Sequence, residues 1–458
     1  MLSLLETINQ LIWGFPLLIL LVGTGVLLTI RLKLIQVLKL PDALKLVLKP
    51  NNKGTGDISS FGAICTELAA VLGTGNIVGV ATAIATGGPG ALFWMWVAAF
   101  FGMATKYAEG VLGIKYRILD ENGNISGGPM YYILNGMGKN FKPIAVLFAI
   151  SGMLVALLGM GTFTQVNAIS STIENTLGIP SGLIGITLAI LTAVITFGGL
   201  PKIAKVAQLL IPFMASGYML ICLLVLVINL KAIMPALQLI IESAFTTQAA
   251  VGGFGGATVM IALRTGVARG VFSNEAGLGS SSIAVAAAKS EWAAEQGLIS
   301  MSGTFLDTLI NTLTGLTLMV TGAWNMAEIQ GSALMEMAFN SILPSIGDLA
   351  IGSVLLMISL TLFAYTTILG WNYYGERCCE FLFGVKAIKP YRLLFILMIS
   401  IGAFLELSAI WLIADIVNGL MVFPNLIALF ALSGVVVQET HHYLTHFKHQ
   451  KIQLVRKG

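Results

Sequence analysis

Long apolar stretches dominate this sequence and limit what the chain can fold into. A helix that crosses a lipid bilayer needs about 20 mostly apolar residues in a row. The sequence has eleven stretches that suit this role, separated by charged residues, prolines and glycines. We therefore predict an all-α, multi-pass membrane protein with spans at 11–31, 57–85, 90–113, 143–174, 181–200, 205–230, 258–289, 297–323, 348–376, 391–412 and 416–437.

The composition supports a lipid environment and argues against a water-soluble fold. Of the 458 residues, 57% are hydrophobic and only 10% are charged, whereas soluble domains have about 25% charged residues. The net charge of +4 is small, so we expect no nucleic-acid partner. The four cysteines show no spacing typical of a zinc site or a disulfide framework, and we interpret them as core residues.

Basic residues alternate between rich and poor connections along the chain. The connection after the first span carries Lys33, Lys39, Lys45, Lys49 and Lys53. The connections that lack both Lys and Arg are 86–90, 175–180, 324–347 and 413–415. Because Lys and Arg concentrate on the cytoplasmic side, we predict an external N-terminus and a cytoplasmic C-terminus in a prokaryotic plasma (inner) membrane.

The predicted helices repeat at a constant offset of 204 residues, which maps Gly73 onto Gly277. Helices two to six then match helices seven to eleven in order. Each unit has an odd number of helices, so the second unit must be inverted in the membrane, as in many secondary transporters. The segments expected are an N-terminal helix with a basic cytoplasmic loop, a first five-helix repeat, an external connection with the second repeat, and a basic cytoplasmic tail: 1–56, 57–232, 233–440 and 441–458.

Each repeat opens with a helix that contains two glycines separated by one residue. The first reads LGTGN at 72–76, and the second reads EAGLGS at 275–280. Glycine disfavours helix by about 1 kcal/mol relative to alanine, and unwound backbone at membrane depth is tolerated only where it lines protein or a watery cavity. We predict two broken helices whose carbonyls bind a cation and whose half-helix N-termini bind a carboxylate. Close packing of helices through small residues is the alternative.

Ionisable residues inside spans are functional candidates. Asp307, near the centre of the eighth span, and Glu275, at the second break, are candidates for cation coupling; a purely structural pairing is the alternative for Asp307. Glu67 fits either a gate residue or a structural ion-pair partner. Lys106 and Glu109 are interpreted as a snorkelling pair near the end of the third span.

Two arginines, Arg264 and Arg269, lie in the outer half of the seventh span. We interpret them as side chains that snorkel to the membrane interface. An external gate in which they pair with Glu406 or Asp415 is the alternative.

Three blocks of the sequence resemble a known transporter family. Residues 87–96 (GGPGALFWMW), continuing to 102–109 (GMATKYAE), are similar to the signature of the alanine or glycine:cation symporter family. Residues 270–280 (GVFSNEAGLGS) and 370–376 (GWNYYGE) resemble two further blocks. The resemblance implies a leucine-transporter-type fold, in which one extra N-terminal helix precedes a 5+5 inverted-repeat core. It also implies sodium-driven uptake of alanine or glycine, with glutamine in some members.

The resemblance also implies binding residues. One sodium site corresponds to the carbonyls of Ala69 and Leu72 and the hydroxyls of Thr366 and Thr367. Asn76 corresponds to a ligand of a second sodium site, for which Ser273 is a further candidate. The residues expected to bind the substrate are Gly73, Thr74, Gly75, Asn76, Phe163, Gln165, Phe272, Ser273, Asn274, Gly277 and Trp371.

Together these features predict a sodium-coupled symporter that imports a small neutral amino acid by alternating access. Its partners are the amino acid, Na⁺ as the co-transported ion, and the bilayer, and we expect a monomer. Proton coupling through Asp307 or Glu275, and preference for glutamine or another neutral amino acid, are the alternatives. An intramembrane enzyme is disfavoured because all four histidines lie in the tail. A channel is disfavoured because the polar groups gather at two helix breaks.

Overall fold

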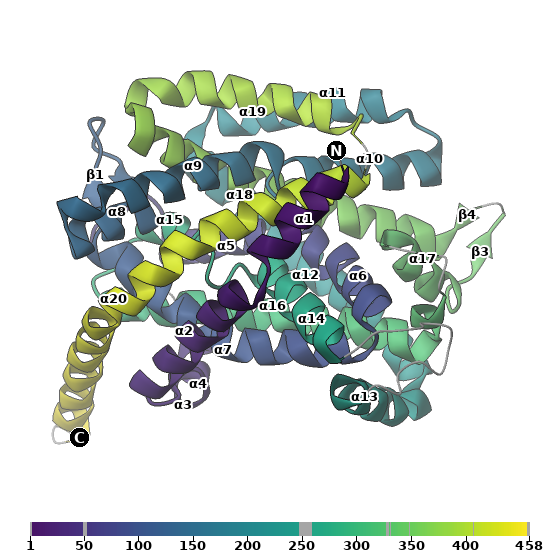
Figure 1. The fold of residues 1–458 in the computed structure, drawn as a ribbon, viewed down its shortest axis with the longest axis horizontal. Coiled ribbons are helices and arrows are strands. Elements are labelled where there is room, and N and C mark those ends of the chain that lie inside the picture. Colours follow the sequence, from purple (N-terminus) through teal and green to yellow (C-terminus); the bar gives the residue numbers. More distant parts are fainter. Residues whose placement is uncertain are drawn as a thin grey trace.

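The computed structural model describes residues 2–48, 53–246, 259–326, 329, 331–347, 349–405 and 407–455. The described chain is almost entirely helical (Figure 1). Its strands form two short antiparallel hairpins, which are β1 (Ile118–Leu119) with β2 (Ile125–Ser126) and β3 (Ser345–Ile346) with β4 (Leu349–Ala350).

The N-terminal part and the first predicted repeat contain the helices up to α12. The helices before the first break are α1 (Leu2–Ile12), α2 (Phe15–Arg31), α3 (Ile35–Leu38) and α4 (Leu40–Leu48). The helices from the first break onward are α5 (Ser60–Val71), the 3-10 turn η1 (Thr74–Asn76), α6 (Val78–Gly87), α7 (Gly90–Lys115), α8 (Pro129–Tyr132), the π-helix η2 (Ile133–Met137), η3 (Lys139–Phe141), α9 (Lys142–Leu158), α10 (Phe163–Leu177), α11 (Ser181–Thr196) and α12 (Gly199–Ile228).

The rest of the chain contains the helices from α13 onward. They are α13 (Leu230–Phe245), α14 (Val259–Asn274), α15 (Ser281–Ala286), α16 (Ala293–Thr321), η5 (Ala323–Asn325), α17 (Ser332–Asn340), α18 (Ile351–Phe383), η6 (Val385–Ala387), α19 (Ile388–Gly402) and α20 (Leu407–Val455). The predicted spans at 258–289 and 348–376 each begin on a residue outside the described part of the chain.

Both glycine pairs interrupt their helices, as predicted. Residues 72–77 separate α5 from α6, and residues 275–280 separate α14 from α15. The halves then pair crosswise, because α5 packs against α15 and α6 packs against α14. Each half of one broken helix therefore lies beside a half of the other, and the two unwound segments meet between them.

Three predicted helix boundaries were wrong. The span predicted at 143–174 is broken at 159–162 into α9 and α10. The connection predicted at 413–415 lies inside α20, and the chain instead turns between α19 and α20 near Ala403. The first span is likewise preceded by a separate helix, since the chain bends at Gly14 between α1 and α2, where Pro16 follows at the start of α2.

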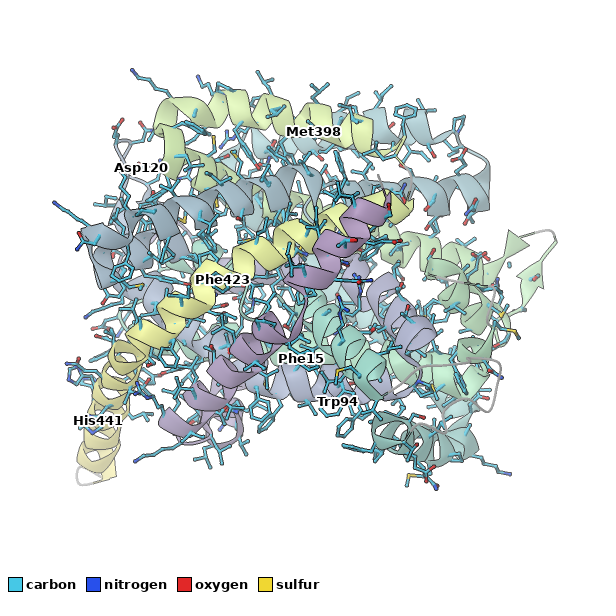
Figure 2. The ribbon with its side chains drawn as sticks, in the orientation of Figure 1. Phe15, Trp94, Asp120, Met398, Phe423 and His441 are labelled. Carbon is cyan, nitrogen blue, oxygen red and sulfur yellow. The ribbon has the colours of Figure 1, made fainter. Side chains whose placement is uncertain are left out.

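Several helices present an apolar exterior that suits lipid. Five segments of the described chain are long and apolar enough to cross a membrane: Ser3–Arg31, Lys139–Leu177, Gly199–Ile228, Ile351–Phe383 and Ile410–His446. Large apolar side chains such as Phe15 and Phe423 point outward, with 60% and 51% of their surface exposed (Figure 2). An exposed apolar surface of this extent is typical of contact with a membrane.

The N-terminal helices lie along α20 at the outside of the molecule (Figure 1). The Trp13 indole N–H donates to the carbonyl of Asp415 at 2.9 Å, and Arg31 donates to the Ser433 hydroxyl at 2.6 Å. Helices α11 and α19 also lie side by side, at the edge of the molecule away from α2 (Figure 1). Helices α1 and α2 thus pack mainly against α20 and α7.

The close approach of α18 to α5 depends on Gly370. A Cβ atom at this position would lie 2.8 Å from the Ala70 Cβ and 2.9 Å from its backbone nitrogen. We expect Gly370→Ala to lower the free energy of unfolding by about 1–3 kcal/mol, because packed helices must separate. Thermal unfolding of the purified protein measures this. Gly217→Ala in α12 is the control, since a Cβ there meets nothing within 4 Å; equal melting temperatures for the two variants would contradict the prediction.

Candidate functional site

The first unwound segment is held by side chains in place of helical hydrogen bonds. The backbone N–H of Gly73 donates to the Asn76 Oδ1 at 3.0 Å, and that of Thr74 donates to the Gln165 Oε1 at 3.2 Å. The segment also packs tightly, because a Cβ at Gly73 would lie 2.4 Å from the Thr367 Oγ1. Gln165 is fixed in turn by its donation to the Met160 carbonyl at 2.8 Å, which the break between α9 and α10 exposes.

Asp307 joins the two broken helices at the centre of the protein. Its Oδ1 accepts from the Asn76 side-chain amide at 2.6 Å and from the Ser273 hydroxyl at 2.7 Å. Its Oδ2 accepts from the Asn311 amide at 2.9 Å. All four side chains are buried. We name this set the Asp307 cluster; it brings together one residue from η1, one from α14 and two from α16, and it gathers oxygen atoms around one carboxylate.

The residues expected at the other sodium site are only partly brought together. The Thr367 hydroxyl lies 3.3 Å from the Leu72 carbonyl, at the seam between α5 and α18. Thr366 donates to the Phe363 carbonyl at 2.9 Å, and its hydroxyl also lies near Met214 of α12. Ala69 is buried one turn before the break. Thr367 therefore faces the unwound segment in this structure, whereas Thr366 faces α12.

The second unwound segment begins at Glu275, whose backbone is left-handed with a φ of +57°. Its carboxylate accepts from the Trp371 indole at 2.8 Å and from the Ser280 hydroxyl at 2.5 Å. Gly277 and Gly279 have φ values of +94° and +78°, which L-residues with a side chain rarely adopt. The glycine pair is thus required by the backbone conformation of the break.

Glu109 accepts hydrogen bonds from this second break, a contact that the sequence did not predict. Its Oε1 accepts from the backbone N–H groups of Gly277 and Gly279 at 2.9 and 3.1 Å. The Asn425 amide of α20 donates to the same oxygen and to the Gly277 carbonyl, both at 2.8 Å. Glu109 is fully buried and does not pair with Lys106, so the predicted snorkelling pair was wrong. Lys106 instead contacts Glu67 and Ser281.

An aromatic and ionic layer covers the centre on the α14 side. Arg269 pairs with Asp415 at 2.5 Å, and its guanidinium lies over the rings of Phe272 and Trp411, at 5.6 and 5.0 Å from their centroids. The two rings are 4.9 Å apart. Arg269 is therefore an inward-facing ion-pair partner, and the snorkelling interpretation was wrong for it. Glu406, the other partner considered, lies outside the described residues.

Three of the expected substrate residues have other contacts in this structure. Asn274 accepts from the backbone N–H of Ala276 at 2.9 Å, as a cap of the broken end of α14. The Phe163 ring packs near Gly402 of α19. Gly277 is engaged by Glu109 and Asn425. Phe272, in contrast, lies at the first break. A Cβ atom at Gly75 would lie 3.3 Å from its ring and 3.0 Å from the Ser273 Cα.

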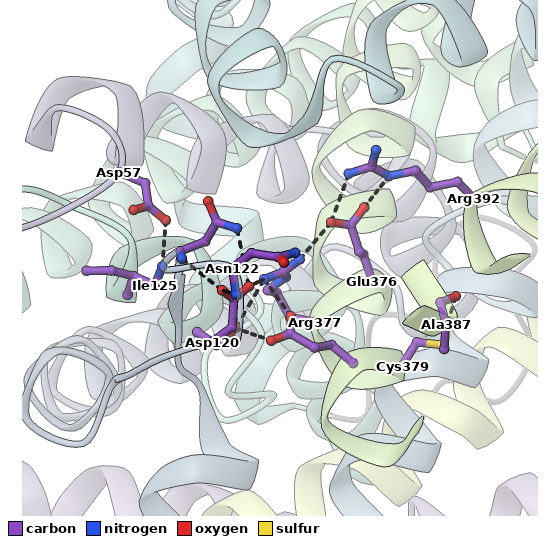
Figure 3. Close-up of polar contacts among 12 residues, drawn as sticks. Asp57, Asp120, Asn122, Ile125, Glu376, Arg377, Cys379, Ala387 and Arg392 are labelled. Atoms are coloured by element: carbon purple, nitrogen blue, oxygen red, sulfur yellow. Dashed lines mark hydrogen bonds and ion pairs between the residues drawn. The ribbon is translucent and has the colours of Figure 1, made fainter. Parts of the chain in front are cut away.

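A charged network lies on the opposite side, where α18 meets α19 and the β1–β2 hairpin (Figure 3). Arg377 pairs with Glu376 at 2.8 Å, with Glu380 at 2.5 Å and with Asp120 of the hairpin at 3.6 Å. Arg392 of α19 pairs with Glu376 at 2.6 Å. A cavity of about 620 Å³ adjoins this network. The centre is thus flanked by ion pairs on two sides.

Solved structures with a similar fold are helical membrane transporters. The structure of MhsT in complex with L-phenylalanine matches with a TM-score of 0.59 at 12% identity, over 84% of this chain and 99% of that one. A variant of the manganese transporter of Eremococcus coleocola matches with a TM-score of 0.52 at 13% identity, over 82% and 77%. These matches show the fold, which is of the leucine-transporter type.

The sequence relatives define the family. The family model described as the sodium:alanine symporter family matches residues 1–457. The sodium/alanine symporter AgcS of Methanococcus maripaludis is 47% identical over 446 residues, which are 96% of each chain. The probable sodium/glutamine symporter GlnT of Bacillus subtilis is 37% identical, over 95% of this chain and 89% of its own. An uncharacterized transporter of Haemophilus influenzae is 52% identical, over 97% of each.

This chain belongs to the sodium:alanine symporter family. The resemblance stated from the sequence is confirmed, as is the prediction of sodium-coupled amino-acid symport. The chain is a multi-pass protein of a prokaryotic cell membrane and belongs with transporters rather than enzymes.

The packing of Gly73 predicts a loss of sodium binding when a methyl group is added. Gly73→Ala places a Cβ against the Thr367 hydroxyl and displaces the Leu72 carbonyl beside it. We expect the rise in melting temperature on exchanging KCl for NaCl to disappear, because ligand binding stabilises the folded state by mass action. Gly79→Ala is the control, since its nearest neighbour is 3.9 Å away. A sodium-induced shift of parental size in Gly73→Ala would argue against sodium at this seam.

Proposed function

We propose that this protein imports a small neutral amino acid, with alanine and glycine preferred, together with Na⁺ by alternating access. The Asp307 cluster is the observation that carries the proposal. It places a buried carboxylate at the point where both broken helices meet, which is where transporters of this architecture bind substrate and ions. A buried carboxylate is costly unless a cation or hydrogen bonds balance it.

Sodium is proposed to bind at two places beside the first break. At the Asp307 cluster, the oxygens of Asp307, Asn311 and Ser273 would hold one ion, with Asn76 as a further ligand. The carbonyls of Ala69 and Leu72 with Thr366 and Thr367 would hold the other. Hard cations prefer oxygen ligands of this kind. Binding at the second place requires Thr366 to turn from α12 toward Leu72, so it would tighten the seam between α5 and α18.

The substrate carboxylate is proposed to bind the backbone N–H groups at Gly73–Gly75. Gln165 supports this position, because its side-chain oxygen already accepts from the Thr74 amide, as a carboxylate oxygen would. The substrate ammonium would lie near the carbonyls at 273–276, close to Glu275. Phe272 and Trp371 would then bound the side chain, and their bulk would favour a methyl group or hydrogen.

The membrane arrangement that we propose follows the crosswise pairing of half-helices. Pairs such as α5 with α15 and α6 with α14 are what two inverted five-helix units, 57–232 and 233–440, would produce. One extra helix in 1–56 precedes them and a tail, 441–458, follows. We propose eleven spans, an external N-terminus, a cytoplasmic C-terminus and a monomer. In this orientation the Arg269–Asp415 pair is external and the Arg377 network is cytoplasmic.

Alternating access would then require one ionic layer to open at a time. The external layer closes over Phe272 and Trp411 through the Arg269–Asp415 pair. On the other side, α5 and α15 and the Arg377 network close the path. The central residues Asn76, Ser273, Asp307 and Trp371 are all buried, which supports a closed state of the proposed cycle.

A proton carried by Asp307 or Glu275 and a preference for glutamine remain the second candidate. The observation that favours it is Asp307 itself, since a buried carboxylate that titrates during the cycle could replace one sodium ion. The relative GlnT, a probable sodium/glutamine symporter, is 37% identical over 440 residues.

Uptake into proteoliposomes tests the proposal. We expect radiolabelled alanine or glycine to accumulate when an inward sodium gradient is imposed, and to stop when potassium replaces sodium. Asn76→Ala and Thr367→Ala should each lower the initial rate at least about tenfold, because each loses a buried polar contact of the site. Thr187→Ala is the control, since Thr187 is exposed on α11. Accumulation of glutamine alone would show that the proposed side-chain pocket is wrong. Uptake that is independent of sodium but driven by a proton gradient would refute sodium coupling.

A further inference from the structure

Two cations, Lys106 in α7 and Arg117 two residues after its end, each connect the chain at α5 with the chain at α15. Lys106 contacts both α5 and α15, whereas Arg117 contacts the end of α15 and the segment that precedes α5. The two half-helices belong to different broken helices and to different predicted repeats. They lie on the side of the molecule where α7 ends.

Lys106 makes the inner of the two connections. Its Nζ lies 3.7 Å from the Glu67 Oε1 of α5 and donates to the Ser281 hydroxyl of α15. Both Lys106 and Glu67 have no exposed side-chain surface. The same Glu67 oxygen accepts from the Ser300 hydroxyl of α16 at 2.7 Å, while the Glu67 Oε2 has no hydrogen-bond partner. A single buried cation thus connects the two half-helices midway along α5.

Arg117 makes the outer connection. It donates to the carbonyls of Ala286 and Ala288, at 2.7 and 2.8 Å, and to the carbonyl of Thr55 at 2.8 Å. The backbone of the two segments is also paired there, through bridges of Thr55 with Ser290 and of Ile58 with Ala288. The segment before α5 is therefore fastened to the end of α15 and the residues after it, and Arg117 ties both to the chain just beyond α7.

The inner connection leads toward the substrate site. Ser281 follows Ser280, whose hydroxyl donates to Glu275, and Glu275 accepts from the Trp371 indole. Any change of Glu275 on binding a substrate would move the first turn of α15. That turn carries the oxygen that holds Lys106.

We propose that Lys106 is a positioning residue that locks α5 and α15 into one gating unit, so that the path from the site opens only when the Lys106 contacts with Glu67 and Ser281 separate. Arg117 keeps the segment before α5 together with the end of α15, so the two half-helices swing as a pair. The lock is reversible because water that enters the opening path hydrates both charges. The proposal rests on the proposed transport function but on no particular substrate.

Electrostatics gives the lock its strength. Four buried carboxyl groups, Glu67, Glu109, Glu275 and Asp307, lie within electrostatic range of Lys106. Removal of one partner of a buried pair leaves the other uncompensated, which is far more destabilising than removal of both. Lys106→Met should therefore loosen the closed unit, and Lys106→Met combined with Glu67→Gln should tighten it again.

Thiol labelling of Cys65 tests the lock directly. Cys65 lies on α5, two residues before Glu67, and is 1% exposed. In a background with Cys222→Ala, Cys378→Ala and Cys379→Ala, the purified protein is treated with a charged methanethiosulfonate reagent without substrate. We expect Lys106→Met and Glu67→Gln each to raise the labelling rate at least about tenfold, and the double variant to return it to near the parental rate.

Lys115→Met is the matched control, because Lys115 is on the same helix but pairs with Glu439 at the surface, with 45% of its side chain exposed. It should label at the parental rate. Parental labelling in Glu67→Gln would overturn the proposal, even if Lys106→Met fails to fold. A double variant that labels as fast as Lys106→Met would also overturn it. If the protein shows the expected labelling pattern but transports no tested amino acid, the proposed substrate is refuted and the proposal that Lys106 locks α5 and α15 is supported.

Discussion

The structure depends on satisfying backbone groups that two unwound segments leave without partners inside an apolar protein. An unpaired backbone N–H or C=O costs several kcal/mol in lipid-like surroundings. At the first break, Asn76 and Gln165 accept from the free amides. At the second, Glu109 accepts from two amides and Asn425 donates to a carbonyl. Each break is thereby tied to helices distant in sequence, and the packing of the whole core follows from these attachments.

The same requirement explains why the charges gather at the centre. The carboxylates that serve the breaks and the proposed cation site are close together, and Lys106 is placed among them. Away from this centre, the Arg269–Asp415 pair joins α14 to α20, and the network of Arg377 and Arg392 joins α18, α19 and the β1–β2 hairpin. In the proposed transport cycle, the ion pairs away from the centre join helices that would have to separate. The charged groups at the centre join the two broken helices that would bind substrate and sodium.

The sequence predicted local features well and distant contacts poorly. The glycine pairs marked two breaks because the signal is contained in a few residues. The family resemblance named Asn76 and Ser273 for one sodium site, but their contact with Asp307 appears only in the structure. Gly159 and Gly161 have the same spacing and lie at a third break. Because they stand within an otherwise continuous apolar run, the sequence predicted an unbroken helix there. The role of Glu109 had no local signal, since its partners lie about 170 residues away. Asp415 was predicted to lie in a connection because a charged residue interrupts the apolar run. In the structure it lies inside α20, where Arg269 pairs with its charge.

Two polar contacts connect helix α20 to the second broken helix, one between Asp415 and Arg269 and one between Asn425 and the Gly277 carbonyl. Ten residues separate the two contacts, a rise of about 15 Å along a helix. Inserting or deleting one residue between them would turn one contact by about 100° relative to the other. The length of this stretch is therefore fixed by geometry. Over evolutionary time, insertions and deletions should accumulate in connections such as the one between α10 and α11, and be absent from this ten-residue interval.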